Sequence, residues 1–202
     1  MFLIEYCAGV DEVGRGPLAG AVFAGAVVLD ALTAIEGLRD SKQLTRKQRE
    51  RLEVEIKARA IGWSVASVDV EEIDRINILQ ASLLAMQRAV GQLSCPVEFV
   101  VVDGNRAPRF DCPAEYLVKG DGKLDCIKAA AIIAKVARDR EMERLDALYP
   151  EYGLAQHKGY PTPQHLEALR KYGPTRIHRM SFAPCRQSEL FQGTPEQCLF
   201  PP

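Results

Sequence analysis

The sequence has no long apolar run, no paired cysteine motif and no large excess of charge of either sign. Its longest nearly apolar stretch, residues 19–29, is far too short to cross a bilayer, and Glu5 interrupts the N-terminal apolar residues before they reach signal-peptide length. The six cysteines are scattered without a C-x-x-C pair or a neighbouring histidine cluster, so neither a zinc site nor a dense disulfide framework is indicated. We expect a cytoplasmic protein without a membrane span.

The composition is that of an ordinary globular chain. With 202 residues, 47% of them hydrophobic and 26% charged, the sequence is long enough for one sizeable domain and unlike a disordered or fibrous chain. A net charge of −1 argues against binding to nucleic acid by bulk electrostatics, although a local basic face stays open. We expect a monomer, divided into a main domain over residues 1–150, a C-terminal segment over 151–186 and a loose tail over 187–202.

Alternating strand and helix patterns predict an α/β fold. Two Val-rich runs, residues 8–13 and 21–29, flank the turn sequence GRGPLAG and predict a hairpin. Thr45 is placed as the N-cap of a charged helix, and a continuous apolar run over residues 97–104 predicts a buried strand. The other elements that we expect are a strand over 63–70, helices over 71–93, a long helix over 125–150 and a short helix over 164–173.

Acidic residues stand where predicted strands or short apolar runs end. Asp11 and Glu12 close the first strand, Asp103 closes the buried strand, and Asp121 follows the run AEYLVKG. The ends of neighbouring strands lie side by side in an α/β sheet, so these acids can converge. Two carboxylates about 4 Å apart repel by roughly 4 kcal/mol at an effective dielectric of about 20. A convergent set therefore needs a cation, and Mg²⁺ prefers such oxygen ligands.

Two further readings of these residues stay open. Each acid can instead cap a helix or complete a turn, because Asp is common at both places. Neighbouring residues of a regular strand point to opposite faces, so Asp11 and Glu12 reach one metal only if a bulge or the bend at Gly14 turns one of them. The sequence Gly14-Arg15-Gly16 either exposes its backbone to a ligand or forms a tight turn before Pro17.

Six ordered blocks resemble one known family, ribonuclease HII, the type 2 ribonuclease H family. The blocks are VDEVGRGPLAG, DSKQLTRKQRE, VDGN, KGDGK followed by AAAIIAKVARD, HKGYPTPQH and HRMSF, and they run from about residue 9 to residue 184. The resemblance implies a ribonuclease H-like fold, a five-stranded mixed sheet flanked by helices, with a small helical C-terminal part that closes over the substrate. It also implies that Asp11, Glu12, Asp103 and Asp121 are the catalytic acids and the ligands of Mg²⁺ or Mn²⁺.

The same resemblance implies an endonuclease that cuts RNA in RNA–DNA hybrids. It is also expected to cut on the 5′ side of single ribonucleotides embedded in duplex DNA, leaving a 3′-hydroxyl and a 5′-phosphate. Gly14, Arg15 and Gly16 correspond to the motif that contacts the ribose 2′-hydroxyl. Tyr160 corresponds to the tyrosine that stacks on the following deoxyribose, unless it is a buried anchor of the C-terminal part. The expected phosphate contacts are Lys42, His178 and Arg179.

Other positions are assigned to less direct roles. Arg46 and Lys47 read equally well as solvated helix charges, and Asp139 between two arginines reads as a structural ion pair. Gln187 and Leu190 have the first half of the spacing of a sliding-clamp peptide, but residues 193–194 are Gly-Thr where its aromatic pair belongs, so no such contact is expected. Two alternatives remain beside the nuclease: another ribonuclease H-like enzyme such as a junction resolvase, and a hybrid-binding module without catalysis.

Overall fold

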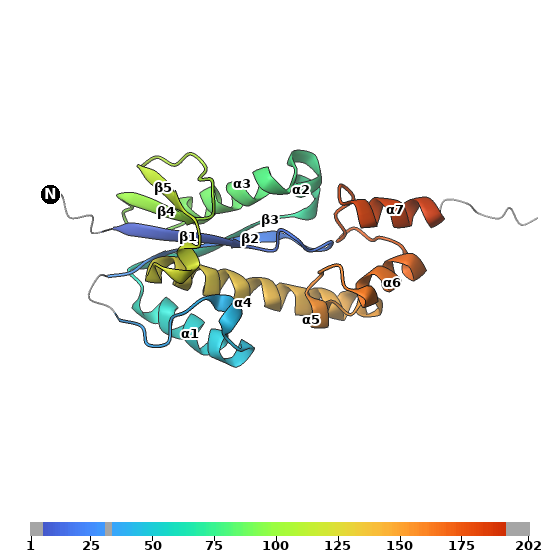
Figure 1. The fold of residues 1–202 in the computed structure, drawn as a ribbon, viewed down its shortest axis with the longest axis horizontal. Helices are drawn as coiled ribbons and strands as arrows, with labels where there is room; N and C mark the ends of the chain where they lie inside the picture. Colours follow the sequence, from blue (N-terminus) through green and yellow to red (C-terminus); the bar gives the residue numbers. More distant parts are fainter. Residues whose placement is uncertain (1–5, 31–33, 193–202) are drawn as a thin grey trace, which may run out of the picture.

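The computed structural model describes residues 6–30 and 34–192, and a five-stranded mixed sheet lies at its centre (Figure 1). The strand order is β3-β2-β1-β4-β5, with β1 antiparallel to β2 and parallel to β4. The strands are β1 Cys7–Val13, β2 Val22–Val28, β3 Gly62–Val68, β4 Phe99–Asp103 and β5 Ala114–Leu117. The predicted fold class and the predicted hairpin of β1 and β2 are confirmed.

Helices cover both faces of the sheet (Figure 1). One face carries α2 Val70–Ile76 and α3 Ile78–Gly91, and the other carries α4 Asp125–Leu148, against which α1 Arg46–Arg59 packs. Two strand glycines let α4 approach closely, since a Cβ on Gly9 would lie 2.3 Å from the Cys126 carbonyl carbon and one on Gly25 2.4 Å from the Ala130 oxygen. The alanines at the start of α4 are therefore part of the core.

Helix α1 begins where the sequence predicts it. The Thr45 side chain accepts a hydrogen bond from the Gln48 backbone N–H, and the Gln48 side chain accepts one from the Thr45 N–H, which completes a capping box. Glu53, buried on α1, then receives two bonds from Arg140 of α4, at 2.9 and 2.6 Å. The capping box fixes the residue at which α1 begins, and the ion pair fixes which face of α1 lies against α4.

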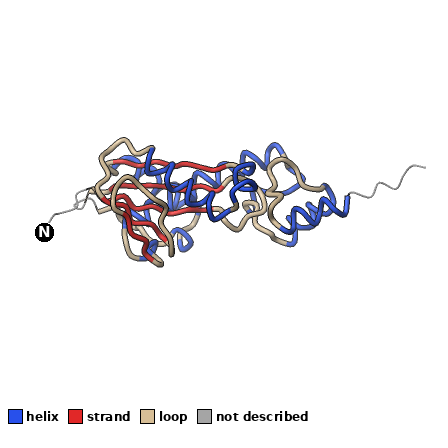
Figure 2. Tube along the Cα trace, turned by 90° about the horizontal axis from the view of Figure 1, so that it is seen from above, coloured by secondary structure: helices blue, strands red, loops and turns tan. Residues whose placement is uncertain are grey.

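The C-terminal part forms a second core at one end of the sheet (Figure 2). It comprises a 3₁₀ turn Pro150–Tyr152 and the helices α5 Leu154–His157, α6 Pro163–Tyr172 and α7 Ala183–Gln192. Its buried apolar residues, which include Tyr152 and Leu169, pack against Leu18 from the loop after β1 and Met142 from α4. The segment is thus built onto the loop that carries the Gly-Arg-Gly motif.

The predicted start of the loose tail at residue 187 is wrong, because α7 continues to Gln192. Among the side chains of α7 whose burial the structure describes, residues 183–188, Cys185 and Ser188 are buried, and one of them is polar. These two positions give the sequence little apolar signal of a helix. The remainder of the predicted tail, residues 193–202, lies outside the described residues. No helix in the described ranges is long and apolar enough to span a bilayer.

Candidate active site

The predicted acids gather around a cavity of about 360 Å³ beside the end of β4. Asp11 and Glu12 come from β1, and Asp103 is the last residue of the neighbouring β4; all three line the cavity. Asp121 lies in the 3₁₀ turn Gly120–Gly122 that follows β5, and its backbone N–H and that of Gly120 both point to Asp103 Oδ1, at 3.4 and 2.6 Å. The structure thus brings three of the acids into the cavity and ties the fourth to one of them.

Asp11 and Glu12 reach the same cavity without a bulge. β1 pairs with β2 in unbroken register through Val13, so no bulge turns one of the two acids toward the other. On its other side β1 pairs with β4 only as far as Val10, so the edge of β1 is free from Asp11 onward. The Asp11 carboxylate turns along the strand to accept a bond from the Glu12 backbone N–H at 2.7 Å. Both side chains therefore reach the cavity around an open strand edge.

The acids affect one another electrostatically. Burial raises the pKa of Asp11 well above its ordinary value, and the negative charges of Glu12, Asp103 and Asp121 raise it further. Burial also raises the pKa of Glu12, although the Arg15 guanidinium 3.3 Å away opposes this. The acids therefore repel one another at Asp11, although Lys42, Arg49 and Lys135 also line the cavity.

The site suits a hard divalent cation by its chemistry. Among the described side chains, no three acids, histidines or cysteines already enclose a point where an ion would sit. The donors around the cavity are carboxylate oxygens, however, and their mutual repulsion is what a bound Mg²⁺ or Mn²⁺ would relieve. Asp11, Glu12, Asp103 and Asp121 are the residues that would hold it.

The Gly-Arg-Gly loop requires glycine at residue 14 and leaves little room for a side chain at residue 16. Gly14 has φ +97°, and a Cβ there would lie 2.2 Å from Arg138 Nε. A Cβ on Gly16 would lie 3.3 Å from Cε1 of Tyr160, so the loop backbone runs against the tyrosine ring. Tyr160 is 41% exposed and lines the cavity with the acids. The structure therefore brings the Gly-Arg-Gly and Tyr160 motifs together beside the acids.

Arg179 and His178 do not contact phosphate directly, contrary to the sequence-based expectation. Their exposed fractions are 0% and 1%, so a phosphate cannot reach them. Arg179 donates instead to the backbone oxygens of Gly14, Arg15 and Gly20, at 2.7 to 3.1 Å. These hydrogen bonds from the Arg179 guanidinium hold the backbone of the Gly-Arg-Gly loop in place. His178 lies in the C-terminal core.

Asp139 forms structural ion pairs, as expected, but not with the two arginines beside it in the sequence. The guanidinium of Arg138 is fully buried and donates to the carbonyls of Ala19, Ala21 and Lys158. Asp139 pairs instead with Lys135 at 2.6 Å and Arg49 at 3.7 Å. The sequence carries no signal for this, because the carbonyl partners come from loops far away in the chain.

Lys42 stands at the open side of the site. Its Nζ lies 3.3 Å from Asp121 Oδ2 while its side chain is 81% exposed. Arg49 donates to the carbonyls of Ser41 and Leu44, which holds the 3₁₀ turn Ser41–Gln43 that carries Lys42. An exposed ammonium beside an acid cluster is suitably placed to meet a substrate phosphate.

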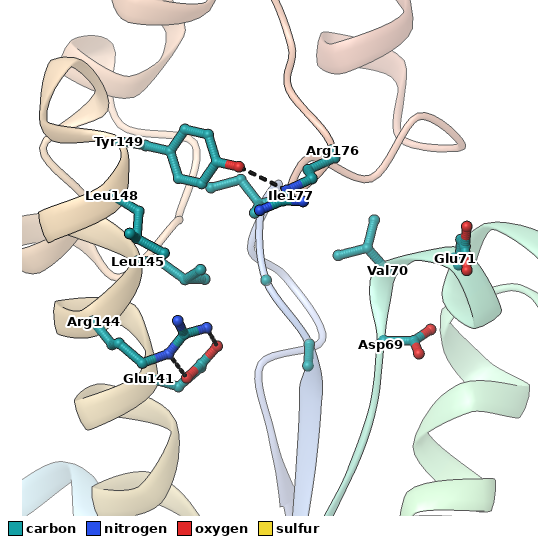
Figure 3. Close-up of a pocket in the computed structure, with 12 residues that line it drawn as sticks. Asp69, Val70, Glu71, Glu141, Arg144, Leu145, Leu148, Tyr149, Arg176 and Ile177 are labelled. Atoms are coloured by element: carbon teal, nitrogen blue, oxygen red, sulfur yellow. Dashed lines mark hydrogen bonds and ion pairs between the residues drawn. The ribbon is translucent and has the colours of Figure 1, made fainter.

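A second cavity, of about 420 Å³, lies between α4, the start of α2 and the segment of Arg176 and Ile177 (Figure 3). Its cationic side chains already have partners: Arg144 binds Glu141, and Arg176 Nε donates to the Tyr149 hydroxyl at 2.9 Å. Three other acids line it, but Glu141 is the partner of Arg144 and Asp69 caps α2, and none of the four acids at the strand ends is among them. The smaller, acid-lined cavity is therefore the candidate active site.

The sheet order and the acid-lined cavity define a protein of the ribonuclease H-like α/β class. A family model described as Ribonuclease HII matches residues 8–185. The chain belongs to the ribonuclease HII family and is a hydrolytic endonuclease with ribonuclease H activity on RNA paired with DNA.

Individual relatives agree with this assignment. The chain is 56% identical over 179 residues to a Ribonuclease HII of Bordetella pertussis, covering 89% of each chain. The crystal structure of ribonuclease H2 from Pyrococcus horikoshii aligns with a TM-score of 0.80 and 31% identity, over 94% of this chain and all of that one. Ribonuclease HII of Archaeoglobus fulgidus, solved in complex with PCNA, aligns with a TM-score of 0.68 and 26% identity, over 89% of this chain and 95% of that one.

Proposed function

We propose that this enzyme uses Mg²⁺ or Mn²⁺ to cut on the 5′ side of a ribonucleotide, both in RNA–DNA hybrids and at single ribonucleotides embedded in duplex DNA. The observation that carries the proposal is the meeting of three motifs at one cavity: the acids, the Gly-Arg-Gly backbone and the Tyr160 ring. An acid cluster alone would fit many nucleases. A glycine loop and an exposed aromatic ring beside it fit an enzyme that recognises a sugar.

In the reaction, water attacks the phosphorus, and the bond from phosphorus to the 3′-oxygen of the preceding nucleotide breaks. The products are a 3′-hydroxyl and a 5′-phosphate on the ribonucleotide, with a water proton ending on the leaving oxygen. Two divalent ions, when bound, supply Lewis acidity that activates water and stabilises charge on the leaving oxygen. Asp11, Glu12, Asp103 and Asp121 supply the negative charge that holds them, and Lys42 meets a neighbouring phosphate.

Recognition of the ribonucleotide falls to the loop and the tyrosine. The backbone of Gly14, Arg15 and Gly16 binds the 2′-hydroxyl, since glycines allow a sugar to approach closely. Tyr160 stacks on the next deoxyribose, where a 2′-hydroxyl would interfere with the ring. The segment 151–186 closes over the substrate because Tyr160 belongs to it and the loop is bonded to it, through Leu18 N–H to the Gly159 carbonyl at 2.8 Å.

We further propose that the enzyme acts as a cytoplasmic monomer without a sliding-clamp contact through its C-terminus. The described cysteines, residues 7, 95, 112, 126 and 185, are free thiols, which suits a reducing compartment. The clamp proposal depends on the Gly-Thr sequence at residues 193–194, which lacks the aromatic pair.

The test is cleavage of duplex DNA that carries one ribonucleotide, with Mg²⁺, with Mn²⁺ or with EDTA. We expect a single cut on the 5′ side of the ribonucleotide with either metal and none with EDTA, while all-DNA duplex stays intact. A uniform RNA–DNA hybrid serves as the second substrate. Cleavage that survives EDTA would refute the metal requirement, and cutting of hybrid but not of the single ribonucleotide would refute the junction activity.

A further inference from the structure

All three histidines of the chain meet in one buried cluster next to the Tyr160 loop. His157 ends α5, His165 lies in the first turn of α6, and His178 lies between α6 and α7. The rings of His157 and His165 stack at 4.6 Å with 17° between their planes, and Nε2 of His165 is 3.2 Å from Nε2 of His178. His165 and His178 are 0% and 1% exposed. None of the three takes part in the chemistry proposed above.

The hydrogen bonds around His165 and His178 fix the proton on each ring. The Thr175 backbone N–H donates to His178 Nδ1 at 3.0 Å, so that nitrogen carries no proton and His178 Nε2 does. His178 Nε2–H then donates to His165 Nε2. The proton of His165 is accordingly on Nδ1, which donates to the Tyr160 carbonyl at 3.0 Å. Three hydrogen bonds thus connect Thr175 to Tyr160, and in each of them the donor is the group nearer to Thr175.

We propose that this chain of hydrogen bonds, the histidine relay Thr175–His178–His165–Tyr160, is a positioning network that fixes the backbone of Tyr160 and thereby the direction of its ring. The inference rests on the stacking role proposed above for Tyr160. Each histidine acts as a neutral ring that accepts on one nitrogen and donates on the other. His165 and His178 are therefore positioning residues and touch no reacting atom.

The local backbone explains why Tyr160 needs an external anchor. Lys158 and Gly159, the two residues before it, have φ of +52° and +81°, in the left-handed region that extended or helical chains do not use. Neighbouring segments bind the successive carbonyls of this loop: Arg138 binds that of Lys158, Leu18 N–H that of Gly159, and His165 that of Tyr160. At the tyrosine itself the bond from His165 adds to two local ones, since Tyr160 N–H donates to the His157 carbonyl at 2.9 Å and Thr162 N–H donates to the Tyr160 carbonyl at 2.8 Å. Of the three, the bond from His165 is the one that links the Tyr160 backbone to the His178 ring.

The two imidazoles, of His165 and His178, can each accept a hydrogen bond on one nitrogen and donate one from the other only while the ring is neutral. A second proton on His165 would place two N–H groups face to face across the 3.2 Å contact with His178, and a second proton on His178 would face the Thr175 N–H across 3.0 Å. Burial lowers the pKa of both histidines, that of His178 to about 3. The neighbouring His157 lowers the pKa of His165 further, and His165 does the same to His178. In the described part of the chain, the groups that contact the two rings are Tyr152, His157, the Tyr160 carbonyl and the Thr175 backbone and hydroxyl, and none of them is a carboxylate that would favour the charged form.

The experiment compares His165→Asn with His165→Leu. The Asn amide nitrogen occupies the place of Nδ1 and can still donate to the Tyr160 carbonyl, whereas Leu fills the space without donating. We expect His165→Leu to lower kcat/KM on the single-ribonucleotide duplex by about 10-fold, with less than about 3-fold loss on uniform hybrid. His165→Asn should recover most of that loss. Equal losses of the two variants, or equal losses on the two substrates, would overturn the relay.

A double-mutant cycle separates positioning of Tyr160 from general support of the fold. In a Tyr160→Ala background, His165→Leu should add less than about 2-fold, because its effect passes through the missing ring. Full additivity would overturn the relay and leave the proposed role of Tyr160 intact. If Tyr160→Ala alone shows no preference between the substrates, the proposed role of Tyr160 fails, and the relay fails with it.

A measurement on the unaltered protein keeps the inference testable if the Leu variant does not fold. Nitrogen-15 NMR of the imidazole rings at neutral pH should show a proton on Nδ1 of His165 and on Nε2 of His178, each ring neutral. Any other pair of tautomers would contradict the direction of the relay. This outcome does not depend on metal or on activity.

Discussion

Gly16 lies against the ring of Tyr160, so that a Cβ on the glycine would be 3.3 Å from Cε1 of the tyrosine. The two residues come from the loop after β1 and from the loop before α6, which are joined by the bond between Leu18 N–H and the Gly159 carbonyl. The loop proposed to bind the 2′-hydroxyl and the tyrosine proposed to stack on the deoxyribose are therefore parts of one structural unit. A change in either is expected to disturb the other.

Gly16→Ala should reduce cleavage at single ribonucleotides by about 10-fold in kcat/KM, because the new methyl group pushes the Tyr160 ring by a few tenths of an ångström and narrows the sugar site. Its thermal stability should change little, since Gly16 is exposed and its φ is not in the left-handed region. The matched control is Gly91→Ala, where a Cβ meets nothing within 4 Å. Wild-type kinetics of Gly16→Ala would show that the Tyr160 ring can make room for the added methyl group without an effect on the sugar site.

Asp11→Asn should abolish cleavage while leaving the protein at least as stable as the wild type in EDTA. Burial and three neighbouring acids raise the pKa of Asp11, so its charge is unfavourable in the absence of metal, and removing it relieves repulsion. Divalent metal should raise the Tm of the wild type and have a smaller effect on the variant. Glu167→Gln, which removes an exposed carboxylate from α6, is the control. A clear loss of stability in Asp11→Asn would indicate a structural role instead.

Glu53→Gln tests what holds α1, the helix next to Lys42, against α4. Burial opposes the charge of Glu53, but bonds from Lys57 and Arg140 outweigh it and lower the pKa of the carboxyl. The amide cannot pair with both cations, so we expect a loss of about 1–3 kcal/mol in the free energy of unfolding. Urea denaturation at pH 7 measures this. Glu55→Gln, whose side chain is 28% exposed against 3% for Glu53, should cost under about 0.5 kcal/mol.

The sequence predicted the parts of the site that come from local pattern and from motifs. The strand ends, the Thr45 cap and the place of the four acids at or just after strand ends could be predicted because each depends on a few adjacent residues. Arg179 and His178 could not be assigned, because a charged or titratable residue in a loop is ordinarily exposed. Their burial depends on the packing of the C-terminal core against residues 14–21, and a sequence does not display which distant carbonyls will satisfy a guanidinium.

Helix α7 is a second case in which the contacts with distant residues could not be predicted from the sequence. Its docking depends on Cys185, which is fully buried and lies 3.6 Å from the Leu18 carbonyl, and on Ser188, which binds the Cys185 carbonyl. Neither residue is a strong marker of a helix face. The contact becomes apparent only once residues 14–21 and the C-terminal segment are seen together in three dimensions.

The stability of the protein should fall in mild acid because of His178. Burial lowers the pKa of this histidine to about 3, against about 6.5 in the unfolded chain, so the unfolded state binds more protons between these values and gains from acidification. Stability is fully present above pH 6.5 and is lost as the pH falls toward 3. At about 1.4 kcal/mol per pH unit, the loss from this residue is about 2 kcal/mol at pH 5.

The measurement is the free energy of unfolding of wild type and His178→Gln at pH 7.5 and pH 5. The raised pKa of Asp11 has the opposite sign, since its protonation relieves repulsion, but it contributes equally to both proteins and cancels in the difference. The variant should be less stable at pH 7.5, because the glutamine cannot both accept from Thr175 and donate to His165 in the geometry of the ring. It should also lose about 2 kcal/mol less than wild type on going to pH 5. Parallel losses in the two proteins would mean that His178 is already accessible to protons in the folded state, which its 1% exposure contradicts.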